Sequence, residues 1–261
     1  IYIQAAVHLA MPLFHTYIGI DYSGAETSTS SLKGLRVFKA QRDTEPTEVQ
    51  PPTSPKRYWT RRAVAEYLVE QLAKEKVLVG IDHGFSFPIQ YFRRYNLTSY
   101  DQFLDDFWLH WPTDADHVYV DFVRDGLNGK GSERMGRSTW RRLCEVRAKA
   151  KSVFHFDCPG SVAKSTHAGL PWLRAIRNTR AHFWPFDGWR VKGNILAEVY
   201  PALFKGRYRF EGTQDQQDAY SVCRGLQEMD LSGDLGQYFE PSLTDEERKI
   251  AELEGWILGV M

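Results

Sequence analysis

Four acidic residues have the types and positions at which chemistry is expected. They are Asp21 in YIGIDYSG, Asp82 in VLVGIDHGFSFP, Glu198 in ILAEVYP and Asp218 in DQQDAY. The first three lie at or near the ends of short apolar runs that are typical of strands, and Asp218 opens a run with helical spacing. Neighbouring buried carboxylates repel one another and are costly unless they are paired. A divalent cation is the simplest partner, so the pattern predicts a metal site.

A purely structural role remains open for each of these acids. Asp21 could begin a turn and cap its own loop, and Glu198 could face outward on an edge strand. Asp215 and Asp218 share a face in the first turn of the predicted helix, where the helix dipole favours acids. However, Asp21 and Asp82 each follow Gly-Ile at a strand end, and open α/β sheets place their sites at the carboxyl ends of strands. This repetition favours a functional role.

The segments around these acids have strand and helix patterns that indicate an α/β protein. Apolar runs predict strands at residues 17–22, 35–40, 77–81 and 195–200. Apolar spacing predicts helices at residues 59–73, 100–108, 138–149, 171–182 and 215–228. Thr244 and Glu247 form a capping box that predicts a last helix.

We expect a single domain over residues 11–261, in which residues 87–190 form a large, partly helical insertion. This insertion is rich in basic and aromatic residues. Residues 1–10 are expected to be a non-native or disordered extension, and the sequence leaves open whether the natural chain starts at Met11.

The charge of the chain is balanced overall but unevenly distributed. It has 33 Lys and Arg against 33 Asp and Glu, yet residues 130–192 hold 14 basic residues against 4 acidic ones. The tail from Glu211 to Glu254 holds 12 acidic residues against three basic ones. Because the local field matters more than the sum, a polyanionic partner is possible. Alternatively, the basic segment could pair internally with the acidic tail.

A dense group of hydrogen-bond donors lies within the insertion, in the stretch SVAKSTHAGLPWL. Its members are Lys164, Ser165, Thr166 and His167, and a helix is predicted to begin at Pro171. Donors before a helix N-terminus form an anion site, although an ordinary helix cap has the same pattern. Further candidate substrate-binding residues are basic and interleaved with aromatics, which suits a nucleic-acid backbone with stackable bases. They are Arg141, Arg142, Arg174, Arg177 and Arg180.

Other patterns exclude several classes of protein. The three cysteines are far apart and form no CxxC pair, so a disulfide framework and a thiolate zinc site are not expected, and a reducing, cytoplasmic compartment fits. No apolar run approaches the roughly 18 residues of a membrane span, so no membrane partner is expected. The sequence contains no phosphate loop, no HExxH and no GxSxG.

Together, the stretches GIDYSG, GIDHGFSFP, SVAKSTHAGLPWL, HFWPFDGW, AEVYP and DQQDAY resemble a family of uncharacterised proteins usually described as predicted RNase H-like nucleases. The order of the acids resembles the wider RNase H-like superfamily, which includes Holliday-junction resolvases. The resemblance implies a mixed five-stranded sheet flanked by helices, with a lid-like insertion. It implies Mg²⁺ or Mn²⁺ at Asp21, Asp82, Glu198 and Asp218, and Asp215 of DQQD is a further candidate ligand.

The first hypothesis is a metal-dependent hydrolase that cleaves phosphodiester bonds in nucleic acid, either DNA or RNA. Two Mg²⁺ or Mn²⁺ ions would be held by the carboxylates. Lys164 would contact the scissile or an adjacent phosphate, and the arginines of the insertion would position the backbone. One alternative is a non-catalytic nucleic-acid or protein-binding module with the same fold. Another is a phosphotransferase of the actin-like or sugar-kinase class, although such proteins need two domains of this kind.

Overall fold

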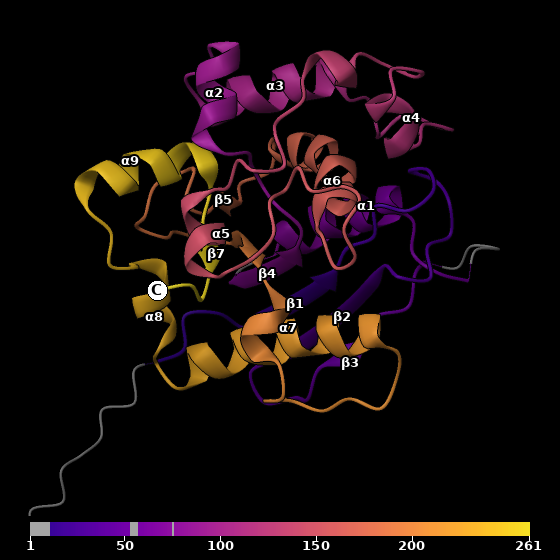
Figure 1. Ribbon diagram of the computed structural model, residues 1–261. Helices are drawn as coiled ribbons and strands as arrows, with labels where there is room; N and C mark the ends of the chain where they lie inside the picture. The colour runs from indigo at the N-terminus through magenta and orange to yellow at the C-terminus, as the bar shows by residue number, and fades with distance from the viewer. Residues whose placement is uncertain (1–10, 53–56, 75) are drawn as a thin grey trace, which may run out of the picture.

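The computed structural model describes residues 11–52, 57–74 and 76–261 (Figure 1). The extension predicted at residues 1–10 lies outside the described residues. Over the described ranges, no helix combines the length and apolar character that a membrane crossing requires.

A mixed sheet forms the centre of the molecule, as the α/β prediction requires. The strands are β1 (Thr16–Asp21), β2 (Arg36–Gln41), β3 (Thr47–Glu48), β4 (Val77–Asp82), β5 (His182–Phe183), β6 (Ile195–Val199) and β7 (Ile257–Leu258). Their order is β3-β2-β1-β4-β6-β5, and β7 also pairs with β6. Strands β1, β4, β6, β5 and β7 are parallel, whereas β2 pairs antiparallel with β1, and β3 pairs antiparallel with β2.

The expected number of five strands is corrected to seven within the described part of the chain. Three of the seven, β3, β5 and β7, are only two residues long. A two-residue strand is too short to show the alternation of apolar and polar residues by which strands are predicted. The four longer strands coincide with the predicted ones to within one residue at each end.

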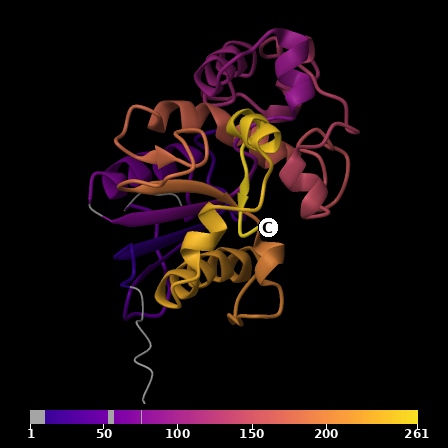
Figure 2. The same cartoon turned by 90° about the vertical axis from the view of Figure 1, so that its left-hand side faces the viewer.

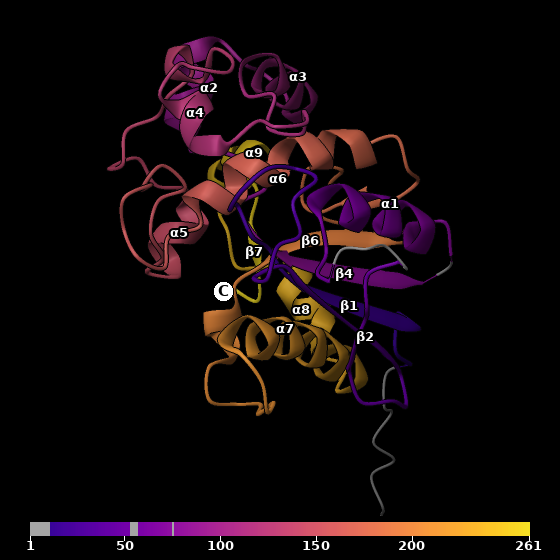
Figure 3. The same ribbon diagram turned by 90° about the vertical axis from the view of Figure 1, so that its right-hand side faces the viewer.

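Helices cover both faces of this sheet. They are α1 (Arg61–Leu72), α2 (Ile89–Tyr95), α3 (Tyr100–His110), α4 (Val120–Arg124), α5 (Leu143–Arg147), α6 (Ala163–Ile176), α7 (Gln214–Leu231), α8 (Leu235–Phe239) and α9 (Asp245–Glu254), with 3₁₀ turns η1 (Gly131–Glu133) and η2 (Pro201–Phe204). Helix α7 crosses one face, and α1 and α6 cover the other (Figure 3). Helices α2, α3 and α4 of the insertion lie beyond α6, on the side of the molecule away from α7 (Figure 2).

Two glycines explain how closely α7 approaches the sheet. A Cβ at Gly19 of β1 would lie 2.4 Å from the backbone nitrogen of Cys223. A Cβ at Gly80 of β4 would lie 2.6 Å from a methyl carbon of Val199 and 2.8 Å from one of Leu226. Real Cβ atoms do not approach other atoms so closely, so each glycine leaves the space that α7 and its side chains occupy.

Helix α6 begins earlier than the sequence pattern predicts. It starts at Ala163, so Pro171 lies inside the helix rather than at its start. Proline has no backbone N–H, and the carbonyl of the residue four positions earlier loses its helical partner. That carbonyl belongs to His167 and accepts a hydrogen bond from the buried Thr113 hydroxyl at 2.6 Å. This replacement bond from a distant segment is what the local pattern could not reveal.

Candidate functional site

Asp21 and Asp82 lie side by side at the carboxyl edge of the sheet. They are the last residues of the parallel neighbours β1 and β4, and they are direct partners in the register. Side chains two residues apart on a strand share a face. Asp21 and Asp82 therefore share the face of Gly19 and Gly80, against which α7 packs. Because α7 begins at Gln214, its first turns bring two more acids to this edge.

Those two acids are Asp215 and Asp218. The Thr213 hydroxyl accepts from the Gln216 backbone N–H and caps the helix, which fixes where its first turn begins. Ala219, next to Asp218, contacts Gly19 of β1 through its carbonyl, so the close approach at this glycine holds the start of α7 against the strand end. The glycine, the cap and the strand end together bring residues nearly 200 positions apart into one site.

The electrostatics of the site follow from burial and crowding. Burial raises the pKa of Asp21 to about 9, helped by the charges of Asp82, Asp215 and Asp218. Burial likewise raises the pKa of Asp82 to about 8, helped by Asp218 and Glu198. Burial also raises the pKa of Asp218. A hydrogen bond of 2.8 Å from the Gln214 amide acts in the opposite direction and lowers this pKa, but burial has the larger effect. Every charged neighbour that shifts these three acids is itself acidic, so the cluster is short of positive charge.

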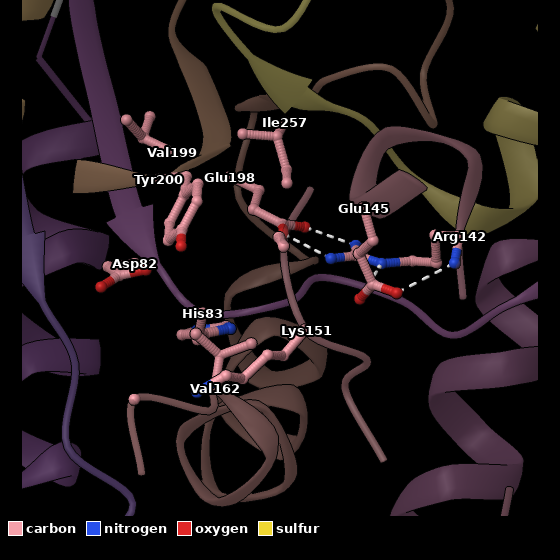
Figure 4. A pocket seen from close by; sticks show the side chains of 12 residues that line it. Asp82, His83, Arg142, Glu145, Lys151, Val162, Glu198, Val199, Tyr200 and Ile257 are labelled. Carbon is pink, nitrogen blue, oxygen red and sulfur yellow. Dashed lines mark hydrogen bonds and ion pairs between the residues drawn. The ribbon is translucent and has the colours of Figure 1, made fainter. Parts of the chain in front are cut away.

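Glu198 occupies a different environment from the three aspartates. Its register partner is Ile81, which packs on the α1 and α6 side of the sheet, so the Glu198 side chain points to that side. There its two oxygens accept hydrogen bonds from Arg142, each at 2.6 Å, and one also accepts the Phe85 backbone N–H. Figure 4 shows Glu198 pointing toward Arg142, with Asp82 on the other side.

Arg142 is itself the centre of a buried polar network. Its side chain is fully buried and donates to the Glu145 carboxylate at 3.0 Å as well as to Glu198. Glu254 of α9 accepts the backbone N–H groups of Ile89 and Leu143. The insertion, strand β6 and helix α9 are thus tied together, because each buried charge here has a partner. Arg142 is therefore part of the framework and not exposed for substrate.

A broad cleft of about 780 Å³ opens over the aspartates. Asp21, Asp82, Asp215 and Asp218 all line it, whereas Glu198 lines a smaller neighbouring cavity that it shares with Asp82 and His83 (Figure 4). One part of the cleft lining is formed by Ser161, just before α6, and by Ser165 in the first turn of α6. Another part is formed by the chain after β6, from Tyr200 to Arg209.

The donors of the predicted anion site divide into two groups. Ser165 lines the cleft, although its hydroxyl donates to the Val162 carbonyl. Thr166 and His167 are fully buried: Thr166 accepts the Gly84 backbone N–H, and His167 Nδ1 is bonded to the Ala163 carbonyl. Burial also lowers the pKa of His167 to about 3. These two side chains therefore hold α6 in place and do not face the cleft.

The predicted cations are mostly occupied by other partners. Lys164 is paired with Asp121 at 2.6 Å, and Arg174 is paired with Asp105 at 2.7 Å. Arg141 donates to the backbone carbonyls of Glu145 and Ala150.

Two further cations lie near the far end of α6. Arg177 is paired with Asp101 and Asp187. Since α6 rises about 1.5 Å per residue, Arg177 lies roughly 20 Å along its axis from Lys164. Arg180 is exposed beside Lys76 and Asn194, at the amino ends of β4 and β6, which is the opposite edge of the sheet from the aspartates. The helix predicted over residues 171–182 is thus wrong at its C-terminal end, because α6 ends at Ile176 and both Arg177 and Arg180 lie beyond it.

Four residues of the cleft were missed by the sequence interpretation. They follow β6 in the chain and line the same cleft as Ser161: Tyr200, Lys205, Tyr208 and Arg209. The signal was available in the stretch YPALFKGRYRF, where basic and aromatic residues alternate within eleven positions. It lies outside the strongly basic segment of residues 130–192, so the count of charges did not select it.

The aspartates of the cleft offer carboxylate oxygens, which are the ligands that hard cations prefer. In the described part of the chain, however, no three His, Cys, Asp or Glu side chains converge into a group that could hold a metal ion as they stand. Asp21 and Asp82 are register partners on neighbouring strands, and Asp218 lines the same cleft. These carboxylates thus form a crowded acidic cluster without a compensating positive charge, and they are not arranged as a set of metal ligands.

No protein-family model, no curated protein and no solved structure matches this chain. The fold and the site define its class as an α/β protein with a mixed sheet and an acidic cleft at the carboxyl edge of the parallel strands. The resemblance to RNase H-like nucleases stays a prediction.

Proposed function

We propose that this protein is a metal-dependent hydrolase that cleaves phosphodiester bonds in nucleic acid. The observation that carries the proposal is the group Asp21, Asp82 and Asp218, at the carboxyl ends of β1 and β4 and the start of α7, with raised pKa values and an open cleft above. Acids so crowded are costly to keep unless a function requires them, and strongly shifted pKa values in a cleft favour a functional site.

Asp21, Asp82 and Asp218 are the residues that would hold Mg²⁺ or Mn²⁺, with Asp215 at the rim. Their oxygens are the donors that these cations prefer. Because the carboxylates form no ready ligand shell, binding requires them to draw closer together. When bound, such an ion polarises a phosphoryl oxygen and lowers the pKa of water, which is the chemistry that phosphodiester hydrolysis needs.

The residues themselves determine when the site can act. With pKa values of about 9 and about 8, the carboxyl oxygens of Asp21 and Asp82 hold protons at neutral pH, and they would have to release these protons to hold a cation. Glu198 remains bonded to Arg142 and acts on the site through its charge, which helps to raise the pKa of Asp82. In this proposal Glu198 positions the loop after β4 by accepting the Phe85 backbone N–H.

A non-catalytic nucleic-acid-binding module is the second candidate function. The pair between Arg142 and Glu198 favours it, because the guanidinium holds the fourth acid away from the aspartates. Under this alternative the cleft would bind nucleic acid without cleaving it.

The two candidates are separated by a cleavage assay. Labelled single-stranded and duplex DNA and RNA are incubated with the protein and with Mn²⁺, Mg²⁺ or EDTA, and the products are resolved on a gel. We expect cleavage with Mn²⁺ or Mg²⁺ only, and loss of cleavage in Asp21→Asn and Asp218→Asn. Asp43→Asn, an exposed aspartate away from the cleft, serves as the control. Cleavage that persists in Asp21→Asn would exclude the proposed site, and binding with no cleavage of any substrate would favour the binding module.

A further inference from the structure

We propose that the wall of the cleft formed by Tyr200, Lys205, Tyr208 and Arg209 binds single-stranded nucleic acid, with the backbone phosphates on Lys205 and Arg209. Such binding would make the proposed function more specific. The choice of a phosphate-bearing polymer as the ligand rests on that proposed function. The proposed contacts lie outside the acidic cluster and outside the basic insertion, and they specify the form of the substrate.

The two cations of the cleft wall are exposed and free to bind an anion. Within the described residues, the side chains of Lys205 and Arg209 make no hydrogen bond and no ion pair. Their neighbour Arg207, in contrast, is paired with Glu228 at 2.7 Å. Lys164, Arg174 and Arg177 also have carboxylate partners. A phosphate can bind Lys205 or Arg209 without breaking an existing pair, so these two cations are the more favourable contacts.

The cleft wall is fixed to the same helix that carries two of the acids. The Tyr208 hydroxyl donates to Glu228 of α7 at 2.7 Å, and Arg207 donates to the same carboxylate. The Phe210 backbone N–H donates to Gln217 of α7, also at 2.7 Å. The segment that carries the free cations is thereby held against α7, whose first two turns contribute Asp215 and Asp218. A phosphate chain on the wall would therefore pass beside the acidic cluster.

The charges of the cleft are arranged so that cations and acids both remain available. In the part of the chain that the structure describes, neither Lys205 nor Arg209 forms an ion pair with Asp21, Asp82, Asp215 or Asp218. The cations of the cleft wall thus do not neutralise the acidic cluster, and the carboxylates do not take up the cations. A polyanion that lies on the cations can approach the cluster once a cation compensates the carboxylates.

Aromatic residues of the cleft wall favour a single strand over a duplex. Tyr200 and Tyr208 are half-buried and line the same cleft, and Tyr200 lies next to Asp82 in Figure 4. Cations that follow the backbone, together with aromatic rings on which bases stack, are the usual means of binding single strands. In a duplex the base faces are covered by neighbouring bases, so the two rings would find no free face.

Fluorescence anisotropy in EDTA tests the cleft wall without interference from cleavage. Labelled single-stranded DNA, single-stranded RNA and duplex DNA of one length are titrated with the wild type and with Lys205→Ala/Arg209→Ala. The control is Arg180→Ala, which removes an exposed cation at the opposite edge of the sheet. Thermal melts of the three proteins show that any loss of binding is not a loss of fold.

We expect single strands to bind more tightly than the duplex, and the double variant to bind them more weakly. The log–log salt slope should fall in magnitude by about 1.4, which is two contacts at about 0.7 each for single strands. The ratio of the two Kd values should therefore change by about sevenfold between 50 and 200 mM salt. Arg180→Ala should bind like the wild type. Equal binding by wild type and double variant, equal loss in Arg180→Ala, tighter binding of the duplex, or no binding by the wild type would each overturn the proposal.

The outcome for the cleft wall is separable from the outcome for hydrolysis. If binding in EDTA depends on Lys205 and Arg209 but the wild type cleaves nothing in Mn²⁺ or Mg²⁺, the proposed binding at the cleft wall would stand and the proposed hydrolase activity would be rejected. If the double variant retains metal-dependent cleavage with an unchanged KM, the hydrolase proposal would stand and binding at the cleft wall would be rejected.

Discussion

The guanidinium of Arg142 donates to both carboxylate oxygens of Glu198, at 2.6 Å each, in a part of the molecule that is almost fully shielded from water. Asp21 and Asp82 are register partners on neighbouring strands, and the charged side chains that shift their pKa values are all acidic. The carboxyl edge of the sheet thus contains two kinds of acid, the buried Glu198 and the half-buried Asp21 and Asp82. One kind is compensated by the protein itself, and the other is left uncompensated, which makes their mutants behave in opposite ways.

Glu198→Gln should destabilise the protein strongly. Removal of one partner of a buried ion pair leaves the other charge uncompensated and typically costs about 3–5 kcal/mol. The amide would also lose one acceptor for the Arg142 guanidinium. Urea denaturation followed by circular dichroism measures the change, with the exposed Glu211→Gln as the control. A free energy of unfolding within about 0.5 kcal/mol of the wild type, the usual range for surface changes, would contradict the structural role of this pair.

Asp21→Asn should stabilise the metal-free protein at alkaline pH. The pKa of Asp21 is about 9 in the folded protein against an ordinary value of 3.8, so the folded state holds a proton that the unfolded state releases. Stability is therefore lost as pH rises from about 4 to about 9, and the variant escapes this loss. One pKa unit equals about 1.4 kcal/mol, so at pH 9 we expect a gain of at least that amount.

Thermal melts between pH 4 and pH 9.5, in EDTA, measure this effect. A gain of about 1.4 kcal/mol corresponds to a rise in Tm of roughly 3–6 °C for a chain of this size. The difference from the wild type should widen as pH rises and vanish near pH 4, while Asp43→Asn should show no such trend. A lower Tm for Asp21→Asn at all pH values would show that the carboxylate is a structural acceptor.

Mn²⁺ binding should release protons at neutral pH. Asp21 and Asp82 hold protons at pH 7 because their pKa values are raised, and a cation binds only the ionised oxygens. Isothermal titration calorimetry in two buffers of different ionisation enthalpy counts the protons. We expect more than one per protein at pH 7, fewer at pH 9.5, and no binding by Asp82→Asn. Heats that do not depend on the buffer would argue against a metal at these acids.

Gly19→Ala should destabilise the protein and disturb the site together. The added Cβ would lie 2.4 Å from the Cys223 backbone nitrogen and 2.5 Å from the Ala219 carbonyl oxygen. Overpacking of this kind costs about 1–3 kcal/mol, and the shift of α7 would move Asp218 away from Asp21. Denaturant unfolding and Mn²⁺ binding should both weaken.

The matched control for this change is Gly236→Ala in α8, where a Cβ would meet nothing within 4 Å. Alanine is favoured over glycine inside a helix by about 0.5–1 kcal/mol, so this variant should be slightly more stable than the wild type. If Gly19→Ala were as stable as Gly236→Ala, the close approach of α7 would not be what positions Asp218.

Much of the fold could be predicted from local patterns alone. The four longer strands and the helices α1, α3 and α7 agree with apolar periodicity, and α9 has the predicted capping box at Thr244 and Glu247. Where the prediction was wrong, a distant partner supplied what the local pattern lacked. Helix α6 continues through Pro171 because Thr113 takes the carbonyl that the proline leaves unpaired, and of the helix predicted over residues 138–149 only Leu143–Arg147 is helical.

The sequence by itself determined the positions of the acids at strand and helix ends, because a carboxylate after an apolar run is a local pattern. Only the tertiary structure decided which acids are uncompensated and which cations are free. Strand alternation and register turned Glu198 toward Arg142, and α7 brought Asp218 to Asp21. Folding also paired Lys164, Arg174 and Arg177 with aspartates of the insertion, leaving Lys205 and Arg209 free at the cleft. Charge pairing depends on distances between residues far apart in the chain, and a count of charges along the sequence does not contain them.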